Sequence, residues 1–349
     1  MFAALLHGRR HLTVESLEEA VLGPGEVRVR VAVALTCGTD LKVWDRGYHA
    51  RMLRPPCRFG HEFAGVICEV TPGAVGWAPG DRVVAANSAP CGCCPACRRG
   101  QENLCDDLVF LNGAYAESLV IPARIVERNL LRLGAGTAFR DAALTEPLAC
   151  VLQGLDDLRL QPGERLLVVG AGPIGLLAAA VATDLGADVA IAGRGVRRLA
   201  AARRLGVGAV VNVTGQDDVE WAVKSTLEEA RFDAVFEAVG TPATWAACTR
   251  LARKGGRVNW FGGCPADTSV TVDTELVHYS ALTLMASFHH TPRTIRRALQ
   301  ILEEGRLRTA DLVDAEASLR DLPRVFESMA SPGGAIKTAI QVNGVPEAS

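Results

Sequence analysis

The stretch Leu166-Leu-Val-Val-Gly170-Ala-Gly172-Pro173-Ile174-Gly175 indicates the fold class of the second half of the chain. Its four leading apolar residues are typical of a short strand buried on both faces of a parallel sheet. Glycines that follow such a strand and open a helix permit a tight turn, close approach of a pyrophosphate to the backbone, and close packing of helix on strand. A glycine turn that serves packing alone is the alternative. The context favours a dinucleotide site, with Gly170, Gly172, Pro173, Ile174 and Gly175 as its expected residues.

Strands and helices alternate after this loop. Short apolar strands are predicted at residues 189–192, 209–213, 233–238, 256–261 and 282–286, with helices between them, one of them at 196–205. Such alternation is typical of an α/β protein with a doubly wound parallel sheet, and two halves of three strands make the full dinucleotide-binding (Rossmann) fold. We therefore expect a Rossmann domain over residues 151–290.

The first 130 residues have a different texture, with short runs of alternating polar and apolar residues broken by glycine and proline turns. This pattern predicts half-buried strands, most clearly at residues 1–6, 26–33, 63–70, 81–86 and 115–121. Helical spacing from Ala142 to Leu158 marks a domain boundary. Helices from about Pro292 and Leu319 and a strand at 335–342 are expected to close the chain.

Four of the eleven cysteines are separated by two, two and seven residues, and they are Cys91, Cys94, Cys97 and Cys105. A short loop with this spacing can place four sulfurs around one tetrahedral zinc ion in a closed, structural site. Cys93 can replace Cys94 as a ligand at little geometric cost, and unrelated buried or disulfide-bonded cysteines are the alternative. We expect a structural-zinc lobe at residues 91–105 with no part in the chemistry.

Composition excludes several classes of partner. The 349 residues include 37 Lys and Arg against 39 Asp and Glu, a formal net charge of −2. The composition therefore has no excess of positive charge of the kind that binds nucleic acid or an anionic membrane. No apolar run reaches membrane-spanning length, and the N-terminus lacks the layout of a signal peptide. Clustered cysteines without a secretion signal predict the reducing cytoplasm. A small molecule is therefore the expected partner.

The end of the second strand of the dinucleotide fold indicates which cofactor binds. Users of NAD usually place an Asp or Glu there, which accepts hydrogen bonds from the adenosine ribose. This chain has Ala192-Gly193-Arg194-Gly195 instead. A carboxylate would repel a 2′-phosphate, whereas a guanidinium binds it with paired hydrogen bonds. We expect NADP(H), with Gly193 giving room, Arg194 binding the phosphate, and Arg198 as a second candidate that also suits a solvated helix surface.

Two stretches near the N-terminus offer a reacting centre, Thr36-Cys37-Gly38-Thr39-Asp40 and Phe59-Gly60-His61-Glu62-Phe63. A catalytic zinc has about three protein ligands and an open position. Cys37, His61 and a carboxylate from Glu62 or Glu146 would supply them. Taken singly, each of these residues also suits a structural role.

Taken together, the motifs resemble those of the zinc-dependent medium-chain dehydrogenases, in particular the sorbitol and threonine dehydrogenase branch. The resemblance covers nearly the whole chain and rests on the order of Cys37-Gly-Thr-Asp40, Gly60-His-Glu-Phe-Ala-Gly65, Pro79-Gly-Asp-Arg-Val83, the cysteine lobe, Glu146-Pro-Leu-Ala149 and the glycine loop. It implies a GroES-like, β-rich catalytic domain formed by residues 1–150 and 291–349, with the Rossmann domain inserted and the active-site cleft between the two. It also implies a homodimer or homotetramer.

The resemblance assigns roles residue by residue. Cys37 and His61 match fixed ligands of a catalytic zinc, and Glu62 and Glu146 match carboxylates that can alternate as a further ligand during turnover. Thr39 matches the hydroxyl that passes the substrate proton onward. Lys42 stands where many relatives have a histidine that ends the relay, and a protonated lysine cannot accept a proton. Gln153 also replaces a histidine that is common in the family.

Other residues carry weaker signals. His289 and His290 invite a metal interpretation, but adjacent residues of a strand point to opposite faces, so they are expected to be cleft or interface residues. Trp44, Tyr48 and His49 can line a substrate pocket or serve loop packing.

The expected function is that of an oxidoreductase with two zinc ions per chain. It transfers hydride between a secondary alcohol, such as a polyol, sugar or cyclitol, and NADP(H). The alternatives are a simple alcohol or aldehyde dehydrogenase, a threonine-type dehydrogenase, and a non-catalytic NADP-binding protein.

Overall fold

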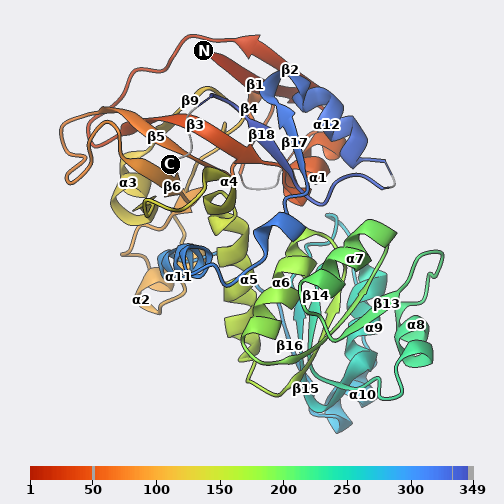
Figure 1. Cartoon of the computed structure of the whole chain (residues 1–349). Helices are drawn as coiled ribbons and strands as arrows, with labels where there is room; N and C mark the ends of the chain where they lie inside the picture. Colours follow the sequence, from red (N-terminus) through yellow and green to blue (C-terminus); the bar gives the residue numbers. More distant parts are fainter. Residues whose placement is uncertain (49–51, 332, 345–349) are drawn as a thin grey trace. The chain divides into compact units, whose positions relative to one another are not determined.

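The computed structural model describes residues 1–48, 52–331 and 333–344. The chain divides into two compact units (Figure 1). The first unit comprises Met1–Ala149 and His290–Ser349, so it is formed from both ends of the chain. The second comprises Cys150–His289.

The second unit, in which every residue is described, contains a parallel sheet of six strands in the order β13-β12-β11-β14-β15-β16. The strands are β11 Arg165–Val169, β12 Asp188–Gly193, β13 Ala209–Asn212, β14 Phe232–Glu237, β15 Ala252–Trp260 and β16 Thr283–Met285. The chain winds from β11 outward to β13 and then from β14 outward to β16. This doubly wound, Rossmann-type sheet confirms the fold class predicted from the alternating pattern.

Helices cover the sheet of the second unit. They are α6 Pro173–Asp184, α7 Val196–Arg204, α8 Val219–Thr226, α9 Pro242–Leu251 and α10 Thr274–Tyr279. Helix α6 packs beside α7, and α8 packs beside α9. Because crossovers between parallel strands are right-handed, helices of the two halves cover opposite faces of the sheet.

The first unit is rich in strands, as the alternating pattern predicted, and its strands pair antiparallel except for β17 with β18, which are parallel. Its largest sheet runs β10-β6-β5-β3-β18-β17, and β9 also pairs with β3. These strands are β3 Val27–Leu35, β5 Phe63–Val70, β6 Arg82–Ala85, β9 Ser118–Ile121, β10 Leu130–Arg132, β17 Ala315–Ser318 and β18 Thr338–Gln341. The predicted strand at 115–121 is shorter than expected, because before Ser118 the chain makes only an isolated bridge from Ala116 to Ala3.

Two smaller sheets complete the first unit. One has the order β2-β1-β4 and comprises β1 Phe2–Gly8, β2 His11–Ser16 and β4 Cys57–Arg58. The other pairs β7 Ser88–Ala89 with β8 Val109–Phe110 and frames the cysteine lobe. The apolar faces enclose a core that includes Phe59, Phe63, Tyr115 and Phe326, each at most 1% exposed.

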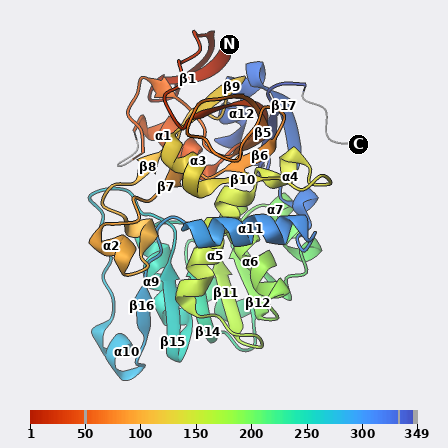
Figure 2. The same cartoon turned by 90° about the vertical axis from the view of Figure 1, so that its left-hand side faces the viewer.

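The helices of the first unit include α1 Gly38–Arg46, α2 Pro95–Arg98, α3 Ala123–Asn129, α4 Phe139–Ala142, α11 Pro292–Glu303 and α12 Leu322–Met329. Helix α11 packs against α3 and α4 (Figure 2). The helix expected over about 142–158 is α5, Thr145–Leu158, and the short helix α4 ends at Ala142 before it. The helix expected from Leu319 begins with a 3₁₀ turn at Leu319–Asp321. None of the helices in the described ranges is long and apolar enough to cross a membrane.

A buried ion pair joins the N-terminal and C-terminal parts of the first unit. Lys337, just before β18, places its Nζ 2.6 Å from Glu62 Oε2, just before β5. The side chains are 1% and 0% exposed. Burial raises the pKa of Glu62, and the charge of Lys337 opposes that shift. Each group therefore depends on the other to remain charged in an apolar interior.

Lys337→Met should lower the free energy of unfolding by about 3–5 kcal/mol, because it leaves the Glu62 carboxylate buried without its cation. Adding Glu62→Gln should recover a large part of that loss, because the remaining side chain then carries no charge. Denaturant unfolding measures both, with Lys254→Met at an exposed lysine as the control. Equal destabilisation by the single and double substitutions would contradict the buried-pair account.

Candidate functional site

Cys37 lies between the end of strand β3 and the start of helix α1. Strand β3 ends at Leu35, and Cys37 is the N-terminal cap of α1, where its Sγ accepts a hydrogen bond from the Thr39 backbone at 3.4 Å. Cys37 is 7% exposed. Asp40, in the first turn of α1, is also buried.

His61 and Glu62 occupy the short segment that leads into β5. The preceding Gly60 has φ +92°, and a Cβ there would lie 2.5 Å from the ring of Tyr115, so only glycine fits. This close approach holds the segment against the core. The ligand atoms of Cys37, His61 and Glu62 lie within 4.8 Å of one another, and all three residues are buried.

Hydrogen bonds orient the imidazole of His61. Its Nδ1 lies 2.9 Å from Asp40 Oδ1, and the Tyr115 hydroxyl donates to Asp40 Oδ2 at 2.7 Å. A carboxylate can only accept, so Nδ1 carries the proton and Nε2 is left as the nitrogen for a metal. A partner of this kind fixes both the tautomer and the orientation of a ligating histidine.

Sequence reasoning missed three residues of this group: Asp40, Tyr115 and Lys337. Asp40 stands three residues after Cys37, a spacing that puts both on one side of a helix. Lys337 lies inside the apolar run Ala335-Ile-Lys-Thr-Ala-Ile340, where an unpaired lysine would be costly. Both signals were available. Nothing in the local sequence distinguishes Tyr115 from an ordinary core residue.

The buried group has a charge pattern that suits a cation. Burial alone would lower the pKa of His61, but the charges of Asp40 and Cys37 outweigh it and hold that pKa well above its usual value. Burial, together with the charge of Glu62, raises the pKa of the Cys37 thiol. Both effects reflect anionic groups gathered in an apolar interior, and a metal ion would compensate them.

The donor set fits zinc. One thiolate sulfur, one imidazole nitrogen and one carboxylate oxygen are the ligands that catalytic zinc sites use. Glu146, in the first turn of α5, is buried, but it is not part of this group. Its charge helps to raise the pKa of Lys337, against the opposing effect of burial and after the larger contribution of Glu62.

The remaining residues predicted for the proton path lie on α1. Thr39 is half-buried, and Lys42 is exposed one turn further along the helix. Trp44 is buried in the core, where it lies 6.1 Å from the ring of Phe326, so it serves packing. Tyr48 is exposed. His49 lies outside the described residues.

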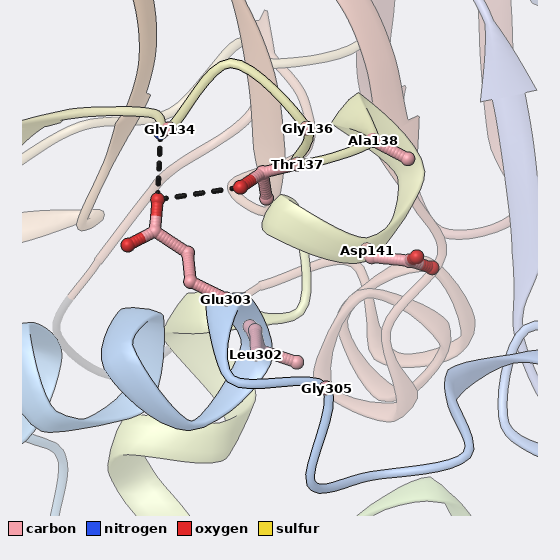
Figure 3. Close-up of a pocket in the computed structure, with 8 residues that line it drawn as sticks. All are labelled: Gly134, Gly136, Thr137, Ala138, Asp141, Leu302, Glu303 and Gly305. Atoms are coloured by element: carbon pink, nitrogen blue, oxygen red, sulfur yellow. Dashed lines mark hydrogen bonds between the residues drawn. The ribbon is translucent and has the colours of Figure 1, made fainter.

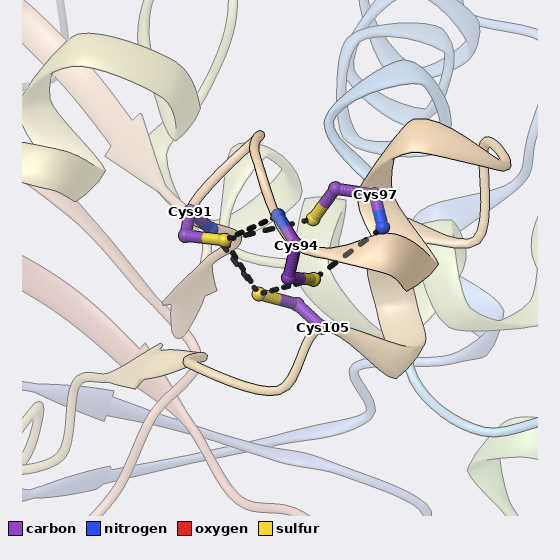
Figure 4. A group of neighbouring side chains, drawn as sticks. All are labelled: Cys91, Cys94, Cys97 and Cys105. Atoms are coloured by element: carbon purple, nitrogen blue, oxygen red, sulfur yellow. Dashed lines mark hydrogen bonds between the residues drawn. The ribbon is translucent and has the colours of Figure 1, made fainter.

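The cysteine lobe brings four sulfurs together, those of Cys91, Cys94, Cys97 and Cys105 (Figure 4). Neighbouring sulfurs are separated by 3.5, 3.9 and 4.0 Å. Metal–sulfur bonds of about 2.3 Å in a tetrahedron predict sulfurs about 3.8 Å apart. Cys93 is exposed and does not belong to this group, so the register uses Cys94.

Backbone amides stabilise negative charge on a sulfur of the lobe. The amides of Cys93 and Cys94 donate to Cys91 Sγ and lower the pKa of that thiol to about 6. Burial raises the pKa of Cys97 to about 12. The raised pKa of Cys97 means that the four thiols do not all ionise in so small a shell without a cation, and the shell fits a closed zinc site.

The glycine loop combines two crowded positions with one open position. Gly170 has φ +113°, and a Cβ at Gly175 would lie 1.8 Å from the carbonyl oxygen of Gly170. A Cβ at Gly172 would meet nothing within 4 Å. Gly172 caps α6, and Pro173 and Ile174 form its first turn. The first and third glycines thus serve the turn and the packing, while the second leaves the helix N-terminus open to an anion.

The end of β12 is free of acidic side chains, as the sequence indicated. A Cβ at Gly193 would lie 2.3 Å from the Cβ of Ala171, so a side chain at this position would collide with the glycine loop. Arg194 is exposed and donates from Nη2 to the carbonyl of Gln216 at 3.0 Å. Arg198, on α7, is half-buried.

Three further residues from the sequence analysis have defined surroundings. His290 is buried, and its Nε2 lies 2.9 Å from Asn87 Oδ1. The ring of His289 stacks on Phe288. Gln153 donates to Asp157, which also accepts from Ser287, so this glutamine belongs to a structural network of the second unit.

A surface pocket of about 430 Å³ lies in the first unit between the loop at 134–138 and the end of α11 (Figure 3). Glu303 Oε1 accepts from the Gly134 amide at 2.7 Å and from the Thr137 hydroxyl at 3.3 Å. The carboxylate therefore ties the loop to the helix. None of the residues that line this pocket belongs to the predicted site.

Comparison with known families and proteins agrees with the two units. Residues 23–129 match the alcohol dehydrogenase GroES-like domain, and residues 173–304 match the zinc-binding dehydrogenase domain. The chain is 34% identical to D-altritol 5-dehydrogenase of Agrobacterium fabrum, over 92% of this chain and 94% of that protein. It is 30% identical to a sorbitol dehydrogenase of Halalkalibacterium halodurans, over 96% of each.

A solved structure extends the comparison to three dimensions. A zinc-binding dehydrogenase from Sinorhizobium meliloti, bound to NADP, is 27% identical and superposes with a TM-score of 0.88 over 97% of this chain and 98% of that one. The GroES-like unit, the doubly wound sheet and the nearly full-length likeness to named dehydrogenases lead to one conclusion. The chain belongs to the family of zinc-dependent medium-chain alcohol dehydrogenases.

Proposed function

We propose that this chain oxidises a secondary alcohol of the polyol, sugar or cyclitol class with NADP⁺ and catalyses the reverse reduction with NADPH. The observation that carries the proposal is the buried group of Cys37, His61 and Glu62, with the imidazole held by Asp40. Buried residues with strongly perturbed pKa values and metal-ligand chemistry are candidates for an active site.

Two zinc ions per chain are part of the proposal. Cys37, His61 and one carboxylate, Glu62 or Glu146, would hold the catalytic ion, and the four cysteines of the lobe would hold a structural one. When bound, zinc supplies a Lewis acid that lowers the pKa of a substrate hydroxyl, and the nicotinamide supplies the hydride acceptor. The lobe has no open ligand position, so its role would be to hold residues 91–105 in shape.

The chain's own residues would move the proton. Thr39 Oγ1 would accept the proton of the substrate hydroxyl and donate its own onward. Lys42 cannot continue the relay, because its ammonium group has no acceptor. The proton would therefore leave to water near the exposed side of α1. Lys337 would keep Glu62 charged while it remains buried.

The choice of a polyol rests on the relatives. Dehydrogenases named for sorbitol and D-altritol match this chain over almost its full length. The choice of NADP(H) rests on Arg194 at the acid-free end of β12, and the NADP-bound relative supports it. We also propose a homodimer or homotetramer in the cytoplasm. All eleven cysteines lie in the described residues and none of them forms a disulfide, which suits a reducing compartment.

Zinc analysis of the purified protein should give two ions per chain. Cys37→Ser should leave one ion and the fold, and Cys94→Ser should lose the other and lower the melting temperature, because closed zinc shells contribute to folding. Cys93→Ser is the matched control and should keep both ions, since Cys93 lies outside the four-sulfur group. A single ion in the wild type would refute the two-site proposal.

A panel of polyols, sugars, simple alcohols and L-threonine, assayed with both cofactors, tests the reaction. The highest kcat/KM is expected for a polyol or sugar with NADP⁺. Cys37→Ser should abolish turnover while NADP binding persists, and Cys68→Ser at an exposed thiol should not change it. A preference for simple alcohols or threonine would overturn the substrate class, and activity in Cys37→Ser would overturn the zinc mechanism.

Arg194→Ala should raise the KM for NADP⁺ by about 10- to 100-fold, because charge-assisted hydrogen bonds to the 2′-phosphate are lost. The KM for NAD⁺, which lacks that phosphate, should stay nearly unchanged. Arg203→Ala, at an exposed arginine in the last turn of α7, is the matched control. Equal losses for the two cofactors would contradict the assignment.

A further inference from the structure

Tyr115 ends a chain of buried hydrogen bonds that leads to His61. Its Oη lies 2.7 Å from Asp40 Oδ2, and the other oxygen of that carboxylate, Oδ1, lies 2.9 Å from His61 Nδ1. The carbonyl of Leu35 is a second acceptor, at 3.0 Å. A phenol has one proton, and the shorter contact to the charged carboxylate is the stronger one.

The phenol ring is fixed independently of its hydroxyl group. It lies against the backbone of Gly60, and its centroid is 6.0 Å from that of the Phe59 ring and 6.1 Å from that of the Phe326 ring, both in edge-to-face geometry. The Tyr115 amide donates to the carbonyl of Phe59, two residues before His61. The ring and the histidine segment are therefore one packed assembly, and the hydroxyl position follows from it.

This arrangement leaves Asp40 no freedom to turn. One carboxylate oxygen is held by Tyr115 and the other by His61, and Asp40 is only 2% exposed. Without the phenol, Oδ2 would lose its hydrogen bond in an apolar interior, and the carboxylate could rotate away from Nδ1. The imidazole would then lose the partner that fixes its tautomer and its orientation beside Cys37 and Glu62.

We propose that Tyr115 is a positioning residue that acts through Asp40 on His61 and strengthens zinc binding at the Cys37 site. The proposal rests on the proposed catalytic zinc. It predicts that the hydroxyl group, and not the ring, controls the metal affinity. Tyr115→Phe keeps the ring and its packing and removes only the hydrogen bond.

The test is a chelator competition on the zinc-loaded protein, with zinc content followed separately for the two sites. Tyr115→Phe should weaken zinc at the Cys37 site by about 10-fold, as expected when an outer partner of a ligating histidine is removed. Zinc in the cysteine lobe should not change, which makes the lobe an internal control for folding. The visible spectrum of the cobalt-substituted Cys37 site should shift as well. Tyr279→Phe, 76% exposed in the second unit, is the matched control.

A double-mutant comparison separates action through Asp40 from a general effect on packing. Asp40→Asn should weaken the same zinc, and Tyr115→Phe combined with Asp40→Asn should be no worse than Asp40→Asn alone. Additive losses, or a zinc affinity of Tyr115→Phe equal to that of the wild type, would overturn the proposal. Loss of the lobe zinc in Tyr115→Phe would assign the residue a purely structural role. A wild type that binds no zinc at Cys37 would refute the proposed function as well.

Discussion

The ion pair of Lys337 with Glu62, beside the hydrogen bond of Asp40 with His61, is the constraint on which the first unit depends. Four charged or ionisable side chains are buried together, and none can remain so without its partner. They come from segments near 40, 61 and 337, so pairing them brings the two ends of the chain to one place. Thr36 Oγ1, which accepts from the Thr338 amide at 2.9 Å, strengthens the same junction.

Cysteine serves two purposes in this molecule, in the lobe and at Cys37. The lobe gathers four sulfurs from fifteen consecutive residues, and its geometry follows from a local loop whose amides point at the sulfurs. The Cys37 group offers a single sulfur, a nitrogen and a carboxylate, and it depends on strands that pair across the sheet. A closed four-sulfur shell has no position for a substrate, whereas a mixed shell of three ligands leaves one.

The three glycines of the loop have different roles, which follow from what surrounds each of them. Gly170 and Gly175 are required by backbone conformation and by contact within the loop, so they specify the turn from β11 into α6. Gly172 is the position with open space, where a ligand can approach the helix N-terminus. Gly193 also has a packing role, because a Cβ there would meet Ala171 of the same loop.

Local sequence patterns were enough to predict much of the fold of this protein. The parallel strands, the loop at 170–175 and the lobe follow from residues close together in sequence, where spacing alone sets the geometry. The candidates Cys37 and His61 are far apart in sequence, and their roles are implied by the resemblance of the whole set of motifs. Helix α1 was missed, because it is short and is capped by a cysteine sulfur rather than by a usual capping residue. The partners Asp40, Tyr115 and Lys337, and the grouping of Glu62 rather than Glu146 with Cys37, needed the folded chain. Their roles come from buried charges that are satisfied only across the sheet, and no local pattern records which distant group will supply the counter-charge.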